Sequence, residues 1–390
     1  MPLTIGILAI VDPSSGGIYQ YTESVLESLT SDNSGKYRYV ILTLDSAKER
    51  VPKLGFEIRT LPISKIPKWL RMLRFFFLFL GIQTQLLMTA AERDTINDID
   101  LFLSPVISPY PHYFSKKPFI FTLHDMQERY YPHFFSWRQR TIRRVLNYRL
   151  TQAAQHILCE AETVHDDIVR FLNVAPAKIS VIVAPPQLSM TELSSTPDKM
   201  SSIRTKYTLP KQFLFYPSQF WPHKNHCSLI DALALLTHEF PDLCLVLTGG
   251  RKHCYSTLVA QVSRLRLTSR VIFTGFVDQS DLGTLVQLAS VMVIPSLFES
   301  VSIPIFEAFA AKVPVCTGHN LHHQVGDAAL CFDPLNPKDI ANQIRLILTD
   351  SDRSKALTVQ GHAMVSQLTG RQFQTNLTKI IDQSLPRKNI

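Results

Sequence analysis

The chain has 390 residues, a formal net charge of +8, and 45% hydrophobic against 18% charged residues. Its length is typical of two domains, and its composition excludes a disordered protein. Up to residue 190 there are 21 Lys and Arg against 17 Asp and Glu, and 19 against 15 after it, so the basic excess forms no tail. The charge favours an anionic partner: a nucleic acid, an anionic membrane surface or a phosphorylated substrate.

Short apolar runs alternate with helix-like stretches through the first half of the chain. The predicted strands are residues 5–10, 39–44, 101–103, 119–123, 156–158 and 179–183, and the clearest helices are 19–29 and 138–155. This alternation is typical of βαβ units in a parallel sheet. Asp98 and Asp100 have the spacing of a metal-binding D-x-D pair, but they directly precede a strand, so we interpret them as part of a loop and predict no metal site.

A Pro-, Ser- and Thr-rich stretch follows, and we predict a linker over residues 186–210. A second alternating series has predicted strands at 213–216, 243–247, 271–273, 291–294 and 313–316, and helices at 227–237, 256–265, 281–289 and 305–311. The sequence therefore predicts an α/β protein with two doubly wound Rossmann-like domains, 1–185 and 211–365, facing a central cleft that holds the ligand. Residues 366–390 are expected to form a helix that packs back on the first domain.

Apolar runs, the N-terminus and the cysteines bear on the location of the protein. No run reaches the roughly 18 uninterrupted apolar residues of a spanning helix, and residues 1–8 lack the basic region of a signal peptide. None of the six cysteines form a C-x-x-C pair. We expect a cytoplasmic protein, with peripheral attachment to the inner face of the membrane as an open alternative.

Two basic stretches lack acidic residues. Residues 69–88 combine many apolar side chains with Lys65, Lys68, Arg71 and Arg74 close by. They form either a helix lying on an anionic membrane or a core helix of the first domain with a basic solvent face. The arginines between 138 and 149 predict either a plain exposed helix face or one that also adds to membrane or acceptor-phosphate contact.

The segment after the predicted strand 291–294 carries two glutamates, Glu299 and Glu307. Pro304 suits the first turn of a helix, so the backbone N–H groups of residues 300–303 would point at an anion. In that first turn, Glu307 would accept hydrogen bonds from a vicinal diol such as a ribose. The alternative is a pair of solvated glutamates, with Glu307 favouring only the helix dipole.

This segment resembles the E-x7-E motif of the retaining glycosyltransferases of family 4, which have the GT-B fold. The matching stretches are Phe298-Glu299, Pro304-Ile305-Phe306-Glu307-Ala308 and Ala311-Lys312-Val313-Pro314-Val315. Other stretches are similar to further family marks, and together they cover nearly the whole chain in the family's order. They are Gly16-Gly17, Thr122-Leu123-His124-Asp125, the Phe215 to His226 segment with Lys224-Asn225, Leu245 to Gly250, and Val271 to Val277.

The resemblance implies a nucleotide-sugar donor, linked to GDP or UDP, and no metal requirement. Lys224 would neutralise the donor diphosphate, Glu307 would bind the ribose, and Glu299 would hold the donor sugar. The implied catalytic residues are His124, Glu299 and Lys224, with His124 near the transferred sugar. The implied donor-binding residues are Gly16, Gly17, Gln219, Lys224, Glu299, Ser300, Val301, Ser302, Ile303 and Glu307.

The chain departs from the family pattern at two places. Ser300-Val301-Ser302 replaces Gly-Phe-Gly, and a positive φ at either serine would cost about 1 kcal/mol. Gln219 stands where the family has an arginine. The expected function is transfer of a sugar, mannose by resemblance, to a glycan or lipid-linked acceptor in cell-surface polysaccharide synthesis. The alternative is a catalytically weak nucleotide-sugar-binding or scaffold protein. Nucleic-acid binding would rest on charge alone, and no binding motif supports it.

Overall fold

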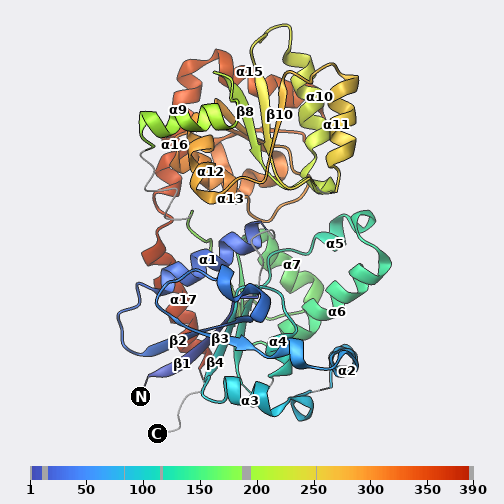
Figure 1. Ribbon diagram of the computed structural model, residues 1–390, viewed down its shortest axis with the longest axis vertical. Coiled ribbons are helices and arrows are strands. Elements are labelled where there is room, and N and C mark those ends of the chain that lie inside the picture. Colours follow the sequence, from blue (N-terminus) through green and yellow to red (C-terminus); the bar gives the residue numbers. More distant parts are fainter. Residues whose placement is uncertain are drawn as a thin grey trace. The chain divides into compact units, whose positions relative to one another are not determined.

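The computed structural model describes residues 2–10, 16–82, 84–114, 117–186, 195–251 and 253–385. The chain divides into two compact units (Figure 1). The first is Met1–Ala184 together with Thr369–Ile390, and the second is Pro185–Leu368. Each unit has its own parallel sheet with helices packed on it.

The first unit has a seven-stranded parallel sheet in the order β3-β2-β1-β4-β5-β6-β7. The strands are β1 (Leu3–Leu8), β2 (Tyr37–Leu44), β3 (Glu57–Leu61), β4 (Leu101–Ser104), β5 (Phe119–Thr122), β6 (His156–Cys159) and β7 (Ile179–Val181). At the centre, Ile5 pairs with Tyr39 on one side and Leu101 on the other. The central strands β1, β4, β5 and β6 are mostly apolar and buried, as expected where both faces of a parallel sheet are covered.

The helices of this unit are α1 (Gly17–Leu29), α2 (Lys68–Leu80), α3 (Ala90–Ile96), α4 (Tyr110–Tyr113), α5 (Gln127–Tyr130), α6 (Trp137–Ala153), α7 (Glu162–Leu172) and α17 (Gly370–Ser384). The last helix, α17, belongs to the end of the chain and packs beside α1. Its apolar residues Phe373, Leu377 and Ile381 lie in the same core cluster as Tyr21 of α1. The 3.6-residue spacing of these side chains explains why one face of the helix is buried.

The second unit has a six-stranded parallel sheet in the order β10-β9-β8-β11-β12-β13. The strands are β8 (Phe213–Pro217), β9 (Cys244–Thr248), β10 (Val271–Gly275), β11 (Val291–Ile294), β12 (Val315–Gly318) and β13 (Leu330–Phe332). The helices are α9 (Pro197–Lys206), α10 (His226–Leu236), α11 (Tyr255–Arg264), α12 (Gln279–Leu288), α13 (Ile303–Ala310), α14 (His322–Val325), α15 (Pro337–Thr349) and α16 (Ser351–Val365).

Helix α9 lies inside the segment expected to be a linker. It packs on α12 of the second unit, where Lys206 Nζ lies 2.6 Å from an Asp281 carboxylate oxygen and the Tyr207 hydroxyl donates to the same oxygen at 2.8 Å. The rest of the expected linker includes residues 187–194, which lie outside the described residues.

Strands β3 and β13 have no counterpart among the predicted elements. Strand β3 reads Glu-Ile-Arg-Thr-Leu and lies at a sheet edge, so its composition carries little apolar signal. Strand β13 has only three residues. Both are defined by pairing with a neighbouring strand, which is a tertiary contact.

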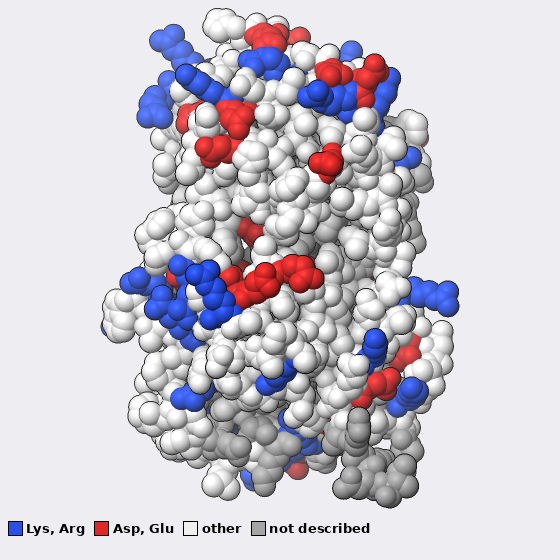
Figure 2. Space-filling view, turned by 180° about the vertical axis from the view of Figure 1, so that it is seen from behind, with Lys and Arg blue, Asp and Glu red and all other residues white. Residues whose placement is uncertain are grey.

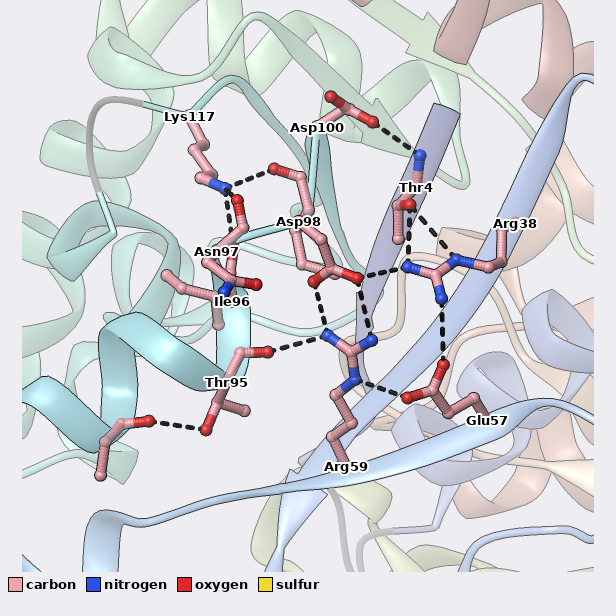
Figure 3. A network of polar contacts seen from close by, with 12 residues as sticks. Thr4, Arg38, Glu57, Arg59, Thr95, Ile96, Asn97, Asp98, Asp100 and Lys117 are labelled. Carbon is pink, nitrogen blue, oxygen red and sulfur yellow. Dashed lines mark hydrogen bonds and ion pairs between the residues drawn. The ribbon is translucent and has the colours of Figure 1, made fainter. Parts of the chain in front are cut away.

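Asp98 and Asp100 are bound within a network of polar contacts at the edge of the first sheet (Figure 3). Asp98 receives two hydrogen bonds from Arg59, of 2.6 and 3.0 Å, and another from Arg38. Asp100 accepts the Thr4 N–H at 2.7 Å. The hydrogen bonds from Arg59 hold the pKa of Asp98 well below its usual range. The D-x-D spacing therefore serves to tie the chain before β4 to β1, β2 and β3.

Candidate active site

Two neighbouring strands of the second unit bring together Lys224 and Glu299, two of the expected donor-binding residues. Strand β8 is followed by the short 3-10 helix Pro222–Lys224, and β11 is followed by the loop that carries Glu299. Because β8 and β11 are adjacent and parallel, both loops leave the same edge of the sheet. Lys224 Nζ lies 2.6 Å from Glu299 Oε1. The Leu297 N–H also donates to the His223 carbonyl at 2.8 Å, which joins the two loops through the main chain.

Glu299 is held as a carboxylate. Its side chain is buried, and the Ser296 hydroxyl donates to the oxygen that faces Lys224. Burial opposes ionisation, but the Lys224 ammonium and the hydroxyls of Ser296 and Ser302 outweigh it and lower the pKa of Glu299. Glu299 is thus an acceptor of hydrogen bonds near neutral pH, and it has no proton to donate to a leaving group.

Asn225, which follows Lys224, positions that lysine. It has a left-handed backbone with φ 54°, a conformation that asparagine tolerates. Its side-chain amide donates to the carbonyls of Pro295 at 3.1 Å and Pro334 at 2.6 Å. These carbonyls follow β11 and β13, so Asn225 joins three loops at one sheet edge. The Lys-Asn pair was part of the family resemblance, but Asn225 was not among the expected site residues.

The main chain around Ser302 is fixed by α14. Gln324 Oε1 accepts the Ser302 N–H at 2.7 Å, and Gln324 Nε2 donates to the Ser302 carbonyl at 2.8 Å. His323 Nε2 lies 2.9 Å from the Ser300 carbonyl. The expectation that all N–H groups of residues 300–303 point at an anion is therefore wrong for Ser302. His323 and Gln324 had no signal in the sequence beyond a polar run after a strand.

The serines of this loop are not strained. Ser302 has φ −104°, and neither Ser300 nor Ser302 is among the described residues with positive φ. Serine in place of glycine therefore carries no backbone strain here, because any L-residue can adopt a backbone without positive φ.

Helix α13 begins at Ile303 with Pro304 in its first turn. Glu307 is its fifth residue, so the prediction that Glu307 lies in the first turn is wrong. Its side chain is buried in the second unit. The solvated-glutamate alternative is therefore excluded for both glutamates, since Glu299 is buried as well.

Gln219, in the loop after β8, contacts the loop that follows the neighbouring strand β9. Its Oε1 accepts the Gly250 N–H at 3.0 Å. The adjacent Gly249 has φ 143°, and a Cβ there would lie 2.8 Å from the Ser218 carbonyl oxygen, so glycine is required. In this structure the Gln219 amide oxygen closes the loops after β8 and β9 on each other.

In the first unit, Gly16 and Gly17 begin α1. Gly16 has φ 64° and ψ −127°, a conformation that only glycine adopts readily, and Gly17 is the first helical residue. The residues between β1 and Gly16 include 11–15, which lie outside the described residues.

His124 follows β5 and is buried, with an edge-on Tyr21 ring at a centroid distance of 5.0 Å. Its Nδ1 lies 2.7 Å from Glu160 Oε2, and its Nε2 lies 2.9 Å from the Pro105 carbonyl oxygen. The Pro105 carbonyl can only accept a hydrogen bond, so Nε2 carries a proton. Burial disfavours the charged ring, but the Glu160 carboxylate outweighs it and raises the pKa of His124.

His124 also lines a cavity of about 340 Å³ within the first unit. Its walls are mainly apolar, from Ile10, Ile18, Val106, Ile107, Ile142 and Leu146, with Asp125, Arg143 and Asn147 beside them. Arg143 is bound to Asp125 and, at 2.9 Å, to Glu128. Both carboxylates neutralise its charge, so the partly exposed Arg143 contributes little to the expected exposed basic face.

Comparison with known protein families accounts for both units. Residues 15–183 match Glycosyltransferase Family 4, and residues 201–364 match Glycosyl transferases group 1. The chain belongs to the group 1 family of glycosyltransferases. The E-x7-E segment and Lys224 lie in the second match, and His124 lies in the first.

Among curated relatives, the chain is 28% identical over 228 residues to the O-antigen chain mannosyltransferase RfbU of Salmonella typhimurium, covering 58% of this chain and 60% of that protein. It is 25% identical over 209 residues to the serotype-specific mannosyltransferase WbdA of Escherichia coli, covering 51% and 25%. The matched stretches thus span less than two thirds of these relatives.

Solved structures share the whole fold. Anabaena HepE in complex with UDP and glucose has a TM-score of 0.77 at 16% identity, covering 97% of this chain and 99% of HepE. WaaG, a glycosyltransferase involved in lipopolysaccharide biosynthesis, has a TM-score of 0.71 at 16% identity, covering 97% and 99%. The two parallel Rossmann-like sheets form the GT-B fold. No helix in the described part of the chain is long and apolar enough to span a bilayer.

Proposed function

We propose that this protein is a retaining hexosyltransferase that moves mannose from a nucleoside diphosphate sugar to a glycan or lipid-linked acceptor in cell-surface polysaccharide synthesis. The observation that carries the proposal is the Lys224–Glu299 pair, 2.6 Å apart where β8 and β11 end. The names of the O-antigen and serotype-specific mannosyltransferase relatives support mannose and a polysaccharide product. HepE was solved in complex with UDP, so the proposal retains both UDP and GDP as candidate donor nucleotides.

Lys224 supplies the charge that the reaction needs. When the nucleoside diphosphate leaves, negative charge grows on its outer phosphate, and an ammonium group stabilises that charge. The Lys224 side chain is 21% exposed, so its ammonium group remains reachable from solvent while Glu299 holds it in place. The proposal assigns this stabilisation to Lys224 without a metal ion.

The proposal assigns no residue as a nucleophile or general base. Glu299 is engaged by Lys224 and Ser296, and His124 by Glu160 and Pro105. In this proposal, as the family resemblance implies, the sugar is transferred by front-face displacement through an oxocarbenium-like species. In this proposal Glu307 binds the donor ribose. His124 lies near the transferred sugar, with its ring held in place by Glu160 and Pro105.

A donor panel tests the proposal. Purified protein is incubated with GDP-mannose, UDP-glucose and other nucleotide sugars, with a polysaccharide-repeat acceptor, and product anomers are read by NMR. We expect transfer with retention from one donor, and a loss of about 10²–10³ in kcat for Lys224→Ala. The matched control is Lys211→Ala, an exposed lysine of the same unit. Transfer that Lys224→Ala leaves unchanged would refute the assignment.

The second candidate is a nucleotide-sugar-binding protein with weak catalysis. The observation that favours it is Gln219, a neutral side chain where the family has an arginine, with its oxygen bound to Gly250. Calorimetry separates the two candidates. Donor binding without transfer or hydrolysis for any donor and acceptor supports the binding protein, and measurable turnover excludes it.

A further inference from the structure

Helix α2 exposes its apolar side and buries a charge. Arg74 is only 1% exposed, whereas Trp69 is 66%, Met72 is 73% and Phe76 is 56% exposed. Phe79 and Leu80 are exposed as well, and the spacing of all five places them on one side of the helix. We call this side, with the exposed Ile82 and Leu86 that follow, the α2 face. The solvent side of α2 is therefore largely apolar, with Lys68 and Arg71 beside the apolar residues, whereas the core-helix interpretation expected a basic solvent face.

The opposite side of α2 is firmly attached. Arg74 donates to both carboxylate oxygens of Glu92, at 2.7 and 2.8 Å, and Glu92 also closes the capping box of α3 with Thr89. Arg74 is therefore buried and does not belong to the expected basic surface. At the other end, Arg149 of α6 donates to the Phe79 carbonyl at 3.0 Å. The orientation of the helix is therefore set by internal contacts that hold the α2 face outward.

The surroundings of the α2 face are basic. No acidic residue occurs from residue 58 to 91, and Lys65, Lys68 and Arg71 are exposed beside the face. Helix α6, which packs against α2, also lacks acidic residues and exposes Arg138 and Arg144. Figure 2, seen from behind, shows Lys and Arg side chains gathered at the left of the first unit. This is the side on which α5 and α6 lie at the right of Figure 1.

We propose that the α2 face docks on the surface of an anionic lipid bilayer. Large apolar and aromatic side chains insert at the boundary of headgroups and acyl chains, and flanking lysines and arginines attract anionic headgroups. A second copy of the chain is a poorer occupant, because two basic surfaces would repel each other. Docking needs neither donor nor acceptor, so it goes beyond the proposed function and is tested separately from transfer.

Vesicle sedimentation tests the proposal with the full chain. We expect binding to phosphatidylglycerol-containing vesicles and much weaker binding to pure phosphatidylcholine. Lys68→Gln and Arg71→Gln should each weaken binding about fivefold, an effect that salt reduces. Trp69→Ser with Phe76→Ser should abolish insertion. All four side chains are exposed, so folding is preserved, and thermal unfolding checks this.

Matched controls lie on α16 of the second unit, where Val359 and Lys355 are also exposed. Val359→Ser and Lys355→Gln should bind vesicles like the unaltered chain. Tryptophan emission gives a second readout: a blue shift on vesicles should disappear with Trp69→Phe and persist with Trp221→Phe. Equal binding to both lipids, or full binding by the Trp69 and Phe76 double variant, would overturn the proposal. The proposal would also be overturned if the unaltered chain bound no vesicles and formed a dimer that the double variant dissociates.

Discussion

Gln324 holds Ser302 by two reciprocal hydrogen bonds, accepting its N–H at 2.7 Å and donating to its carbonyl at 2.8 Å. The N–H and carbonyl groups of Ser302 belong to a buried residue at the start of α13, where leaving a polar group unpaired would destabilise the fold. The side chain of a residue on α14 thus shapes the loop between Glu299 and α13.

Gln324→Ala should lower the free energy of unfolding by about 1–3 kcal/mol, because two buried main-chain groups lose their partners. It should also raise the KM for the donor, since the loop that follows Glu299 loses its support. Urea unfolding and donor kinetics measure the two effects. Gln360→Ala, at an exposed position on α16, is the control and should change neither. A Gln324→Ala protein with unchanged stability would show that the hydrogen bonds contribute nothing.

The Lys224–Glu299 pair predicts opposite effects on binding and turnover. Glu299→Gln removes a negative charge beside the proposed diphosphate position, so affinity for the free nucleoside diphosphate should stay the same or increase. The kcat should fall at least tenfold, because Lys224 loses the carboxylate that positions it. Calorimetry and initial rates measure these effects. Loss of nucleotide affinity in Glu299→Gln would contradict the idea that Glu299 acts through Lys224.

The buried His124–Glu160 pair predicts a dependence of stability on pH. The folded-state pKa of His124 is raised, so its contribution is fully present below the unfolded value of about 6.5 and is lost as pH rises through the folded value. Unfolding free energies between roughly pH 6 and 9 should therefore fall more for the unaltered chain than for Glu160→Gln. By NMR, the His124 ring should lose its second proton at a higher pH in the unaltered chain than in Glu160→Gln. Equal titration of the ring in the two proteins would disprove the assignment.

The Arg74–Glu92 pair predicts a large asymmetry between single and double variants. Arg74→Met leaves Glu92 buried without its partner and should destabilise the chain by about 3–5 kcal/mol. The double variant with Glu92→Met should be less destabilised than the two single effects added together. It should still lose about 1 kcal/mol, because Glu92 also completes the cap of α3. Urea unfolding of all four proteins gives the coupling energy, and additive effects would refute a direct interaction.

Asp98 predicts sensitivity to acid. Its pKa is depressed by Arg59 and Arg38, so its contribution is present above the unfolded value of about 3.9 and is lost as pH falls through the folded value. The stability difference between the unaltered chain and Asp98→Asn should shrink as the pH is lowered from about 5 towards 2. The pair is partly exposed, so the difference is expected to be modest. A constant difference over this range would contradict the depressed pKa.

The alternation of apolar runs and helical patterns in the sequence was sufficient to predict an α/β protein with two parallel sheets. Most strands, from 5–10 to 291–294, are buried on both faces and so have an apolar composition that is visible in the sequence. The family motif likewise marks Lys224 and Glu299 in the sequence without reference to their contact. Such local signals survive in the sequence because they depend on the residue types themselves.

Tertiary structure alone decided which groups are available. The sequence could not show that Gln324 occupies the Ser302 N–H, that Glu160 and Pro105 bind both nitrogens of His124, or that Arg74 points inward while Trp69 points outward. The physical reason is the same in each case, because the charge and exposure of a side chain depend on partners many residues away. Pairing with Glu92 offsets the desolvation of Arg74, so this charge is buried while the α2 face stays in solvent.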